Sequence, residues 1–163
     1  MLLINAALVP VESPRIDNGY IRILDQKIAA FGPMPAPNPD EGEEVLDLCG
    51  LTAYPGFVDG HCHIGMFADG LGFEGDDGNE ETDPVTPHLR AIDAVNPMDR
   101  CFQEALEQGI TTVVTGPGSA NPIAGQFCAM KTFGRRVDDM VIREPVAMKF
   151  ALGENPKTVY NDK

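Results

Sequence analysis

Two of the three histidines in this 163-residue sequence stand one residue apart, in the stretch PGFVDGHCHIG from Pro55 to Gly65. If the short apolar strand that begins at Phe57 continues through this stretch, its side chains alternate between two faces, so His61 and His63 point the same way. Two imidazoles at this spacing can bind one divalent cation at about 2.0–2.1 Å each. The spacing favours a metal site, although the same pattern also arises by chance in surface loops.

Two neighbours of the histidines bear on this hypothesis. Asp59 shares the predicted face and could accept a hydrogen bond from a ring N–H, which would fix the tautomer of a metal-bound histidine. Cys62 faces the other way and need not be a ligand. The alternative for Cys62 is a reactive thiol that the adjacent histidines activate.

Composition limits the classes of partner. The chain has 12 Lys and Arg against 25 Asp and Glu, and its net charge of −13 disfavours nucleic acid or an anionic membrane as the main partner. The opening MLLINAALVPVESP has no basic segment and its apolar run is soon interrupted, so we expect neither a signal peptide nor a membrane span. We therefore expect a cytoplasmic protein. Its four cysteines include no CxxC pair, so we expect thiols rather than disulfides.

Short strands are predicted before the histidines. Apolar, β-prone residues indicate strands at residues 2–9, 20–24, 27–31 and 45–48. Asn18-Gly19 and Asp25-Gln26 are predicted turns between them. Four short strands at close spacing favour a small antiparallel sheet that is too thin to bury both faces by itself.

An acidic loop is predicted after the histidines, over about residues 65–97. Its segment EGDDGNEETD, residues 74–83, has six carboxylates and no basic residue. Oxygen ligands suit Ca²⁺, but the segment lacks the spacing of an EF-hand loop. A solvated, mobile loop is the favoured interpretation, and loops of this length are usually functional or disordered.

A strand–helix–strand pattern follows. Asn96 is a suitable N-cap and Gly109 a suitable terminator for a helix. The apolar stripe of this helix comprises Met98, Cys101, Phe102, Ala105 and Leu106. Residues 110–115 form a β-branched run typical of a buried parallel strand. The following GPGS favours a tight turn over a phosphate-binding loop, because a third glycine and an adjacent lysine are missing.

A second, fainter pass of the same kind is predicted beyond this turn. Residues 123–133 are predicted as a short helix and residues 146–150 as a third parallel strand. The order of elements indicates a doubly wound sheet or a barrel.

PGFVDGHCHIG resembles the first-strand signature of the metal-dependent amidohydrolase superfamily, in which Pro-Gly, two apolar residues and an aspartate precede a His-x-His pair. The strands before it resemble part of the family's small β-sandwich, and QGITTVVTGPGSANP resembles its second barrel strand and loop. The similarity is closest to the imidazolonepropionase-like branch. It implies an α/β chain with a partial, composite β-sandwich at residues 1–54. Residues 55–163 would then be the first three or so β/α units of an incomplete TIM-like (β/α)8 barrel.

The resemblance also implies a function. Members of this family hydrolyse carbon–nitrogen bonds other than peptide bonds, in amides or cyclic amide-like and imide-like rings, by attack of a metal-activated water. His61 and His63 match the first two metal ligands. Zinc is the first candidate, with manganese and iron as alternatives. The remaining histidine ligands and the general-base aspartate belong to later strands, so we expect them beyond residue 163.

Lys149 and His88 are weaker candidates. Lys149 is the one lysine in a candidate barrel strand and could be a carbamate ligand or a substrate-binding residue, but the family's bridging lysine usually comes from a later strand. His88 lies in the long loop and could help to shape a pocket for a small-molecule substrate. The chain is thus interpreted as an N-terminal piece of an amidohydrolase, and a homo-oligomer or a partner chain could complete its barrel. The alternative is a non-catalytic remnant or assembly module.

Overall fold

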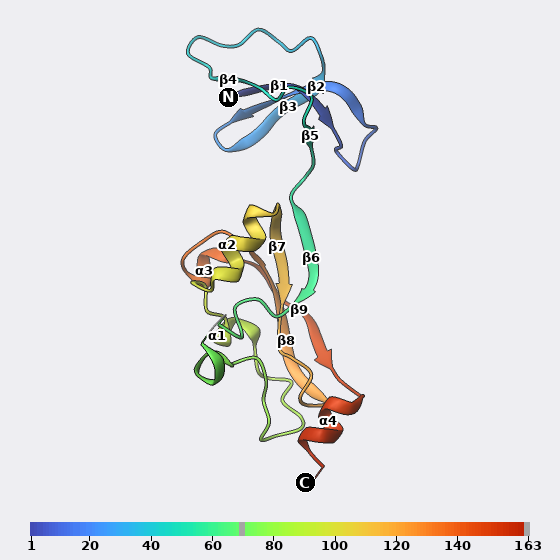
Figure 1. The fold of residues 1–163 in the computed structure, drawn as a ribbon, viewed down its shortest axis with the longest axis vertical. Coiled ribbons are helices and arrows are strands. Elements are labelled where there is room, and N and C mark those ends of the chain that lie inside the picture. The colour runs from blue at the N-terminus through green and yellow to red at the C-terminus, as the bar shows by residue number, and fades with distance from the viewer. Residues whose placement is uncertain (69–70, 162–163) are drawn as a thin grey trace. The chain divides into compact units, whose positions relative to one another are not determined.

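The computed structural model describes residues 1–68 and 71–161. Two compact units divide the chain between Pro55 and Gly56. The first unit is a sheet of β1 Leu2–Leu8, β2 Ile16–Leu24, β3 Lys27–Pro33, β4 Val45–Asp47 and β5 Thr52–Ala53 (Figure 1). Its strand order is β3-β2-β1-β4, and β5 also pairs with β1.

The predicted all-antiparallel sheet is wrong at one edge. Strands β1, β2 and β3 pair antiparallel, but β4 and β5 run parallel to β1. The reason is the connection between β3 and β4, because residues 34–44 are a long loop rather than a tight turn. A connection of this length can carry the chain back so that it re-enters the sheet in the direction of β1.

The two predicted turns have different outcomes. The turn at Asp25-Gln26 is confirmed, with both residues at positive φ (48° and 61°), as a tight hairpin requires. The turn at Asn18-Gly19 is wrong, because both residues lie inside β2. Gly19 is needed there for packing, since a Cβ atom would lie 2.7 Å from the Leu8 side chain.

The second unit is built on a four-stranded sheet in the order β6-β7-β8-β9. Its strands are β6 Phe57–Cys62, β7 Ile110–Thr115, β8 Ile123–Lys131 and β9 Val141–Phe150. Its helices are η1 Gly72–Gly75, α1 Ala91–Ala94, α2 Arg100–Glu107, α3 Val137–Met140 and α4 Glu154–Val159. As predicted for residues 110–115, β7 pairs parallel with β6. No helix among the described residues is long and apolar enough to cross a membrane.

The helix predicted at residues 123–133 is wrong. These residues form β8, which pairs antiparallel with both β7 and β9. Both faces of β8 are largely buried, so its apolar residues do not alternate and their spacing imitates that of a helix. The strand predicted at residues 146–150 is confirmed as part of β9 and runs in the direction of β6 and β7, but it pairs antiparallel with β8 rather than beside a parallel neighbour. One strand–helix–strand unit, β6 to α2 to β7, is therefore followed by a meander.

Helix α2 begins later than predicted, at Arg100 rather than next to Asn96. Asp99 is the N-cap, and its carboxylate accepts the backbone N–H groups of Cys101 (3.1 Å) and Gly65 (3.2 Å). The Asn96 side chain instead accepts the N–H of Met98 in a local turn. Met98 therefore lies outside the helix and is 69% exposed, in contrast to the predicted apolar stripe.

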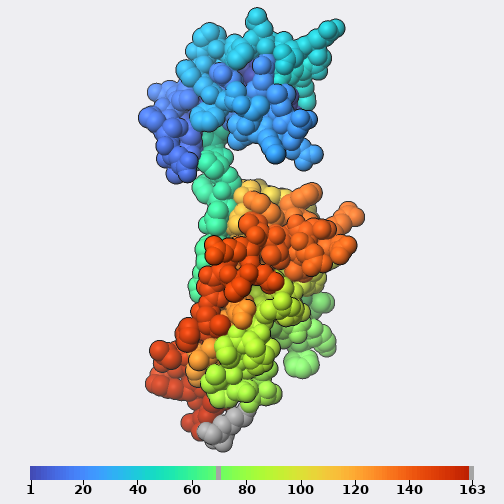
Figure 2. Space-filling view, turned by 180° about the vertical axis from the view of Figure 1, so that it is seen from behind, coloured from blue at the N-terminus to red at the C-terminus, as the bar shows by residue number. Residues whose placement is uncertain are grey.

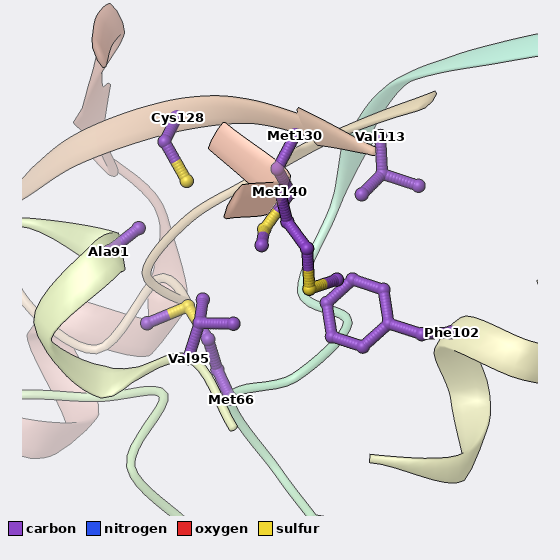
Figure 3. Packing of buried hydrophobic residues seen from close by; sticks show 8 residues of the cluster. All are labelled: Met66, Ala91, Val95, Phe102, Val113, Cys128, Met130 and Met140. Atoms are coloured by element: carbon purple, nitrogen blue, oxygen red, sulfur yellow. The ribbon is translucent and has the colours of Figure 1, made fainter. Parts of the chain in front are cut away.

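The core of this unit is one cluster of buried residues (Figure 3). Its members are Met66, Ala91, Val95, Phe102, Val113, Cys128, Met130 and Met140. They come from α1, α2, β7, β8, α3 and the segment after β6. The cluster therefore joins the short helices to one face of the sheet and makes β7 and β8 a rigid base.

The acidic loop is largely exposed over residues 74–83, as predicted for a solvated segment, and it is also hydrogen-bonded to the β7, β8 and α4 regions of this unit. Gly118 donates a backbone hydrogen bond to Gly78 (2.7 Å), and Thr86 donates one to Ile123 (2.8 Å). The Tyr160 hydroxyl lies 3.0 Å from the carbonyl oxygens of both Glu80 and Asp83. Figure 2 shows the loop segment before α2 packed against the later strands of the unit.

We predict that Asp99→Ala destabilises the protein by about 1–2 kcal/mol, because it removes an N-cap and the bond to the Gly65 N–H. Urea unfolding measures the change. Asp138→Ala is the control, since Asp138 is an exposed residue whose loss should change stability by less than about 0.5 kcal/mol. Equal stabilities of the two variants would contradict the capping role.

Candidate metal centre

The two histidines stand where β6 ends. Strand β6 advances three residues, from Asp59 to Cys62, while β7 advances two, from Val113 to Thr115, so β6 contains a bulge. After this bulge the rings of His61 and His63 come together, with centroids 5.4 Å apart and planes at 82°. The His61 side chain is exposed and that of His63 is half-buried.

His63 is oriented by the end of the neighbouring strand. Its Nδ1 atom lies 2.7 Å from the carbonyl oxygen of Gly116, the residue that follows β7. A carbonyl can only accept, so Nδ1–H is the donor of this hydrogen bond and Nε2 is the nitrogen that remains for a metal. This is the arrangement found around metal-bound histidines, in which the second nitrogen donates to an oxygen. No side-chain pattern in the sequence indicates a backbone carbonyl of this kind.

Asp59 does not hold either ring. Its carboxylate accepts the backbone N–H of His61 at 3.1 Å. The predicted hydrogen bond from a histidine ring to Asp59 is not found among the described residues. The prediction assumed an unbroken alternation along β6, which the bulge interrupts. Asp59 therefore shapes the turn of the backbone at His61.

Phe127 of β8 is the residue that sequence reasoning missed. Its ring centroid lies 5.4 Å from that of His61 and 6.4 Å from that of His63. The side chain was overlooked because residues 123–133 were predicted to be helical. Phe67, on the segment after β6, adds a further edge contact to His63 at 6.1 Å.

Lys149 reaches this cluster, whereas His88 does not. Lys149 is half-buried on β9, and its Nζ atom lies 6.0 Å from the centroid of the Phe127 ring. It makes no ion pair with any described carboxylate. His88 is exposed in a turn of the acidic loop, and no ring contact or hydrogen bond joins it to the histidine pair among the described residues.

The separation of the imidazoles fits a shared cation. A ring centroid lies about 1.1–1.2 Å from each ring nitrogen and a zinc–nitrogen bond is about 2.1 Å long, so two imidazoles on one tetrahedral ion have centroids about 5.3 Å apart. The observed 5.4 Å agrees with this value. Within residues 1–68 and 71–161, no group of three or more His, Cys, Asp and Glu side chains could hold an ion. Among the described residues, the two histidines can therefore supply only part of a coordination sphere.

Cys62 does not have the character of an activated thiol. Its side chain packs against the core cluster. Burial raises the pKa of Cys62 above its ordinary value, and the nearby charge of Asp59 adds to this effect. A raised pKa leaves the thiol protonated near neutral pH, which disfavours the nucleophile alternative.

A cavity of about 410 Å³ adjoins His63. The acidic loop contributes Asn79 and Glu81 to its wall, the segment after β7 contributes Ser119, and α4 contributes Asn155. The Asn155 amide donates to the Ser119 hydroxyl at 2.6 Å, which ties α4 to the end of β7. The cavity therefore offers hydrogen-bonding groups beside a candidate metal ligand.

Known proteins resemble all or part of this chain. It is 32% identical over 160 residues to the amidohydrolase tasK of Hapsidospora irregularis, covering 91% of this chain and 16% of that protein. It is 26% identical over 168 residues to an adenine deaminase of Listeria monocytogenes, covering all of this chain and 23% of that protein. A 49-residue stretch is 49% identical to the imidazolonepropionase of Caldanaerobacter subterraneus, covering 30% of this chain and 11% of that protein. No family model matches.

The fold has a solved counterpart. An amidohydrolase from Thermotoga maritima superposes with a TM-score of 0.87 and 40% identity, over 99% of this chain and 41% of that one. The mixed α/β sheets therefore match those of an amidohydrolase.

These similarities support the amidohydrolase superfamily, whose members generally use divalent metals. Within the superfamily, the chain resembles the imidazolonepropionase-like branch of hydrolases. It spans between about a tenth and two fifths of the lengths of these relatives.

The buried thiols lead to a prediction about reactivity. Burial raises the pKa of Cys128 to about 11, whereas Cys49 is exposed. At pH 8, iodoacetamide should modify Cys49 well before Cys128, and Cys128 labelling should accelerate as the pH approaches its pKa. Peptide mass spectrometry measures both rates, with urea-unfolded protein as the control. Equal labelling rates in the folded protein would contradict the burial of Cys128.

Proposed function

We propose that the protein is a metal-dependent hydrolase of carbon–nitrogen bonds other than peptide bonds, and that His61 and His63 hold its divalent cation. The observation that carries the proposal is the pair of imidazoles 5.4 Å apart, with Nδ1 of His63 occupied by the Gly116 carbonyl. Relatives named amidohydrolase, adenine deaminase and imidazolonepropionase support hydrolysis of this kind of bond. Zinc is the first candidate, and manganese or iron would suit the same donors.

The residues of this chain would bind and orient. A divalent cation at the pair supplies Lewis-acid activation of water and of a carbonyl or ring carbon. The Gly116 carbonyl would accept from Nδ1–H of His63, so that Nε2 is the nitrogen presented to the metal. The cavity beside His63 is in the size range of small-molecule sites, about 300–1,000 Å³. Its amide and hydroxyl groups suit an amide or a cyclic amide-like substrate.

The remaining ligands and the general-base aspartate would come from polypeptide outside these residues. The chain covers 41% of the Thermotoga maritima structure, which leaves room for later strands of a TIM-like barrel and for the rest of a composite β-sandwich. Apolar side chains that the first unit exposes, such as Ile28 and Phe31, agree with a sheet that requires more polypeptide. Residues 1–54 and 55–163 would be the two parts of this arrangement.

A second candidate is a non-catalytic module that requires a partner chain. The lack of a third ligand grouped with the two histidines, among residues 1–68 and 71–161, favours it. The two candidates differ in whether the histidine pair holds metal at all.

We predict that His61→Ala and His63→Ala each reduce bound zinc to background and abolish hydrolysis of amide substrates, because each removes one of two neighbouring donors. His88→Ala is the matched control, since His88 is exposed and has no contact with the pair. Elemental analysis after dialysis measures zinc per chain in the complete protein. Zinc retained in full by both pair variants would contradict the proposal and favour the non-catalytic module.

We predict that Lys149→Met raises KM by about 10- to 100-fold without changing zinc content, because its ammonium would bind substrate rather than metal. The reason is that a half-buried ammonium without a carboxylate partner is suited to an anionic or strongly polar group. Steady-state kinetics and elemental analysis of the same samples test both parts. Loss of zinc comparable to that of His63→Ala would instead make Lys149 a ligand.

A further inference from the structure

Phe127 occupies an unusual place for a buried aromatic residue. It is only 5% exposed, yet it lies outside the core cluster that its neighbours Cys128 and Met130 join. Its ring instead contacts both histidine rings and lies within 6.0 Å of the Lys149 ammonium. The burial of this ring therefore belongs to the candidate metal centre rather than to the core.

The same ring packs on Gly116. A Cβ atom at Gly116 would lie 2.3–2.4 Å from three atoms of the Phe127 ring, so only glycine leaves the space that the ring fills. Gly116 is also the residue whose carbonyl oxygen lies 2.7 Å from Nδ1 of His63. The ring thus packs against the backbone that presents this carbonyl, and it links β8 to the orientation of His63.

His61 depends on the ring more directly. Among the described residues, the His61 ring has no hydrogen-bond partner, whereas its backbone N–H donates to Asp59. The rings of His63 and Phe127 are its neighbours, each with a centroid 5.4 Å away and at interplanar angles of 82° and 67°. Edge-to-face contacts between aromatic rings are favourable at centroid distances of about 4.5–7 Å. These contacts are what orients an otherwise exposed imidazole.

We infer that Phe127 is a positioning residue for the histidine pair, and that it sets the affinity of the pair for a divalent cation. The inference rests on the proposed function, because it takes the pair to be the metal-binding element. The ring holds His61 by an edge contact and holds His63 through Gly116. A side chain of similar bulk without a ring fills the space but orients neither imidazole.

The test compares Phe127→Leu with Phe102→Leu in the complete protein. Phe102 is 3% exposed in the core cluster and makes no ring contact with either histidine, so its substitution matches the loss of buried aromatic area. Zinc affinity is measured by competition with a chromophoric chelator, and urea unfolding measures stability. Phe127→Leu should weaken zinc binding by about 10- to 100-fold, the range seen when supporting groups around a metal are removed. Phe102→Leu should destabilise the fold comparably and change zinc affinity by less than about 3-fold.

Two further variants complete the test. Phe127→Tyr keeps the ring and should bind zinc within about 3-fold of the unsubstituted protein. If Phe127→Leu does not fold, Phe127→Met replaces it, with the same loss of affinity expected. In the zinc-free protein, ¹⁵N NMR should show altered ring signals of His61 and His63 in the ring-less variants and unaltered signals in Phe102→Leu.

Three outcomes would overturn the inference. Unchanged zinc affinity in the ring-less variants contradicts the role of Phe127 and leaves the proposed function standing. An equal loss of zinc affinity in Phe102→Leu would show that the loss in Phe127→Leu comes from lower stability of the fold and not from the position of the ring. Failure of the unsubstituted protein to bind zinc at the pair contradicts the proposed function together with the inference.

Discussion

The hydrogen bond from the His63 imidazole to the Gly116 carbonyl is the contact on which the candidate metal centre depends. It requires the ends of β6 and β7 to lie side by side, which their parallel pairing provides. It decides which nitrogen of His63 remains to bind a metal, because the carbonyl accepts a hydrogen bond from Nδ1–H and Nε2 is left over. It also passes through a glycine on whose open side the Phe127 ring packs. The arrangement thus depends on β6, β7 and β8 together.

Two sets of residues surround this contact, namely the core cluster and the residues that line the cavity. The core cluster, with Phe102, Val113 and Met130, fixes the strands from the helical side. The acidic loop is bonded to the ends of β7 and β8 through its backbone, and with α4 it walls the cavity beside His63. The main chain of the loop therefore shapes the approach to the histidines, and this role does not require its carboxylates to bind a cation.

Features that depend on local residue types and spacing could be predicted from the sequence, whereas features that depend on tertiary packing could not. The His-x-His pair, the parallel strand at residues 110–115 and the Asp25-Gln26 turn follow from residue types and spacing. Strand β8 was missed because it is buried on both faces, so its apolar spacing does not distinguish a strand from a helix. Asp59 was misplaced by a bulge, and Gly116 acts through a carbonyl that every residue has. Phe127 could be recognised only once β8 was known.

The central proposal is that the two imidazoles, with centroids 5.4 Å apart, bind one shared cation. Anomalous diffraction at the zinc edge, from crystals of the complete protein grown with zinc, tests this most directly. The account predicts a zinc peak about 2.0–2.1 Å from Nε2 of His63 and from a ring nitrogen of His61, with Nδ1 of His63 still bonded to Gly116. A zinc peak at other ligands, with none between the two imidazoles, would contradict it.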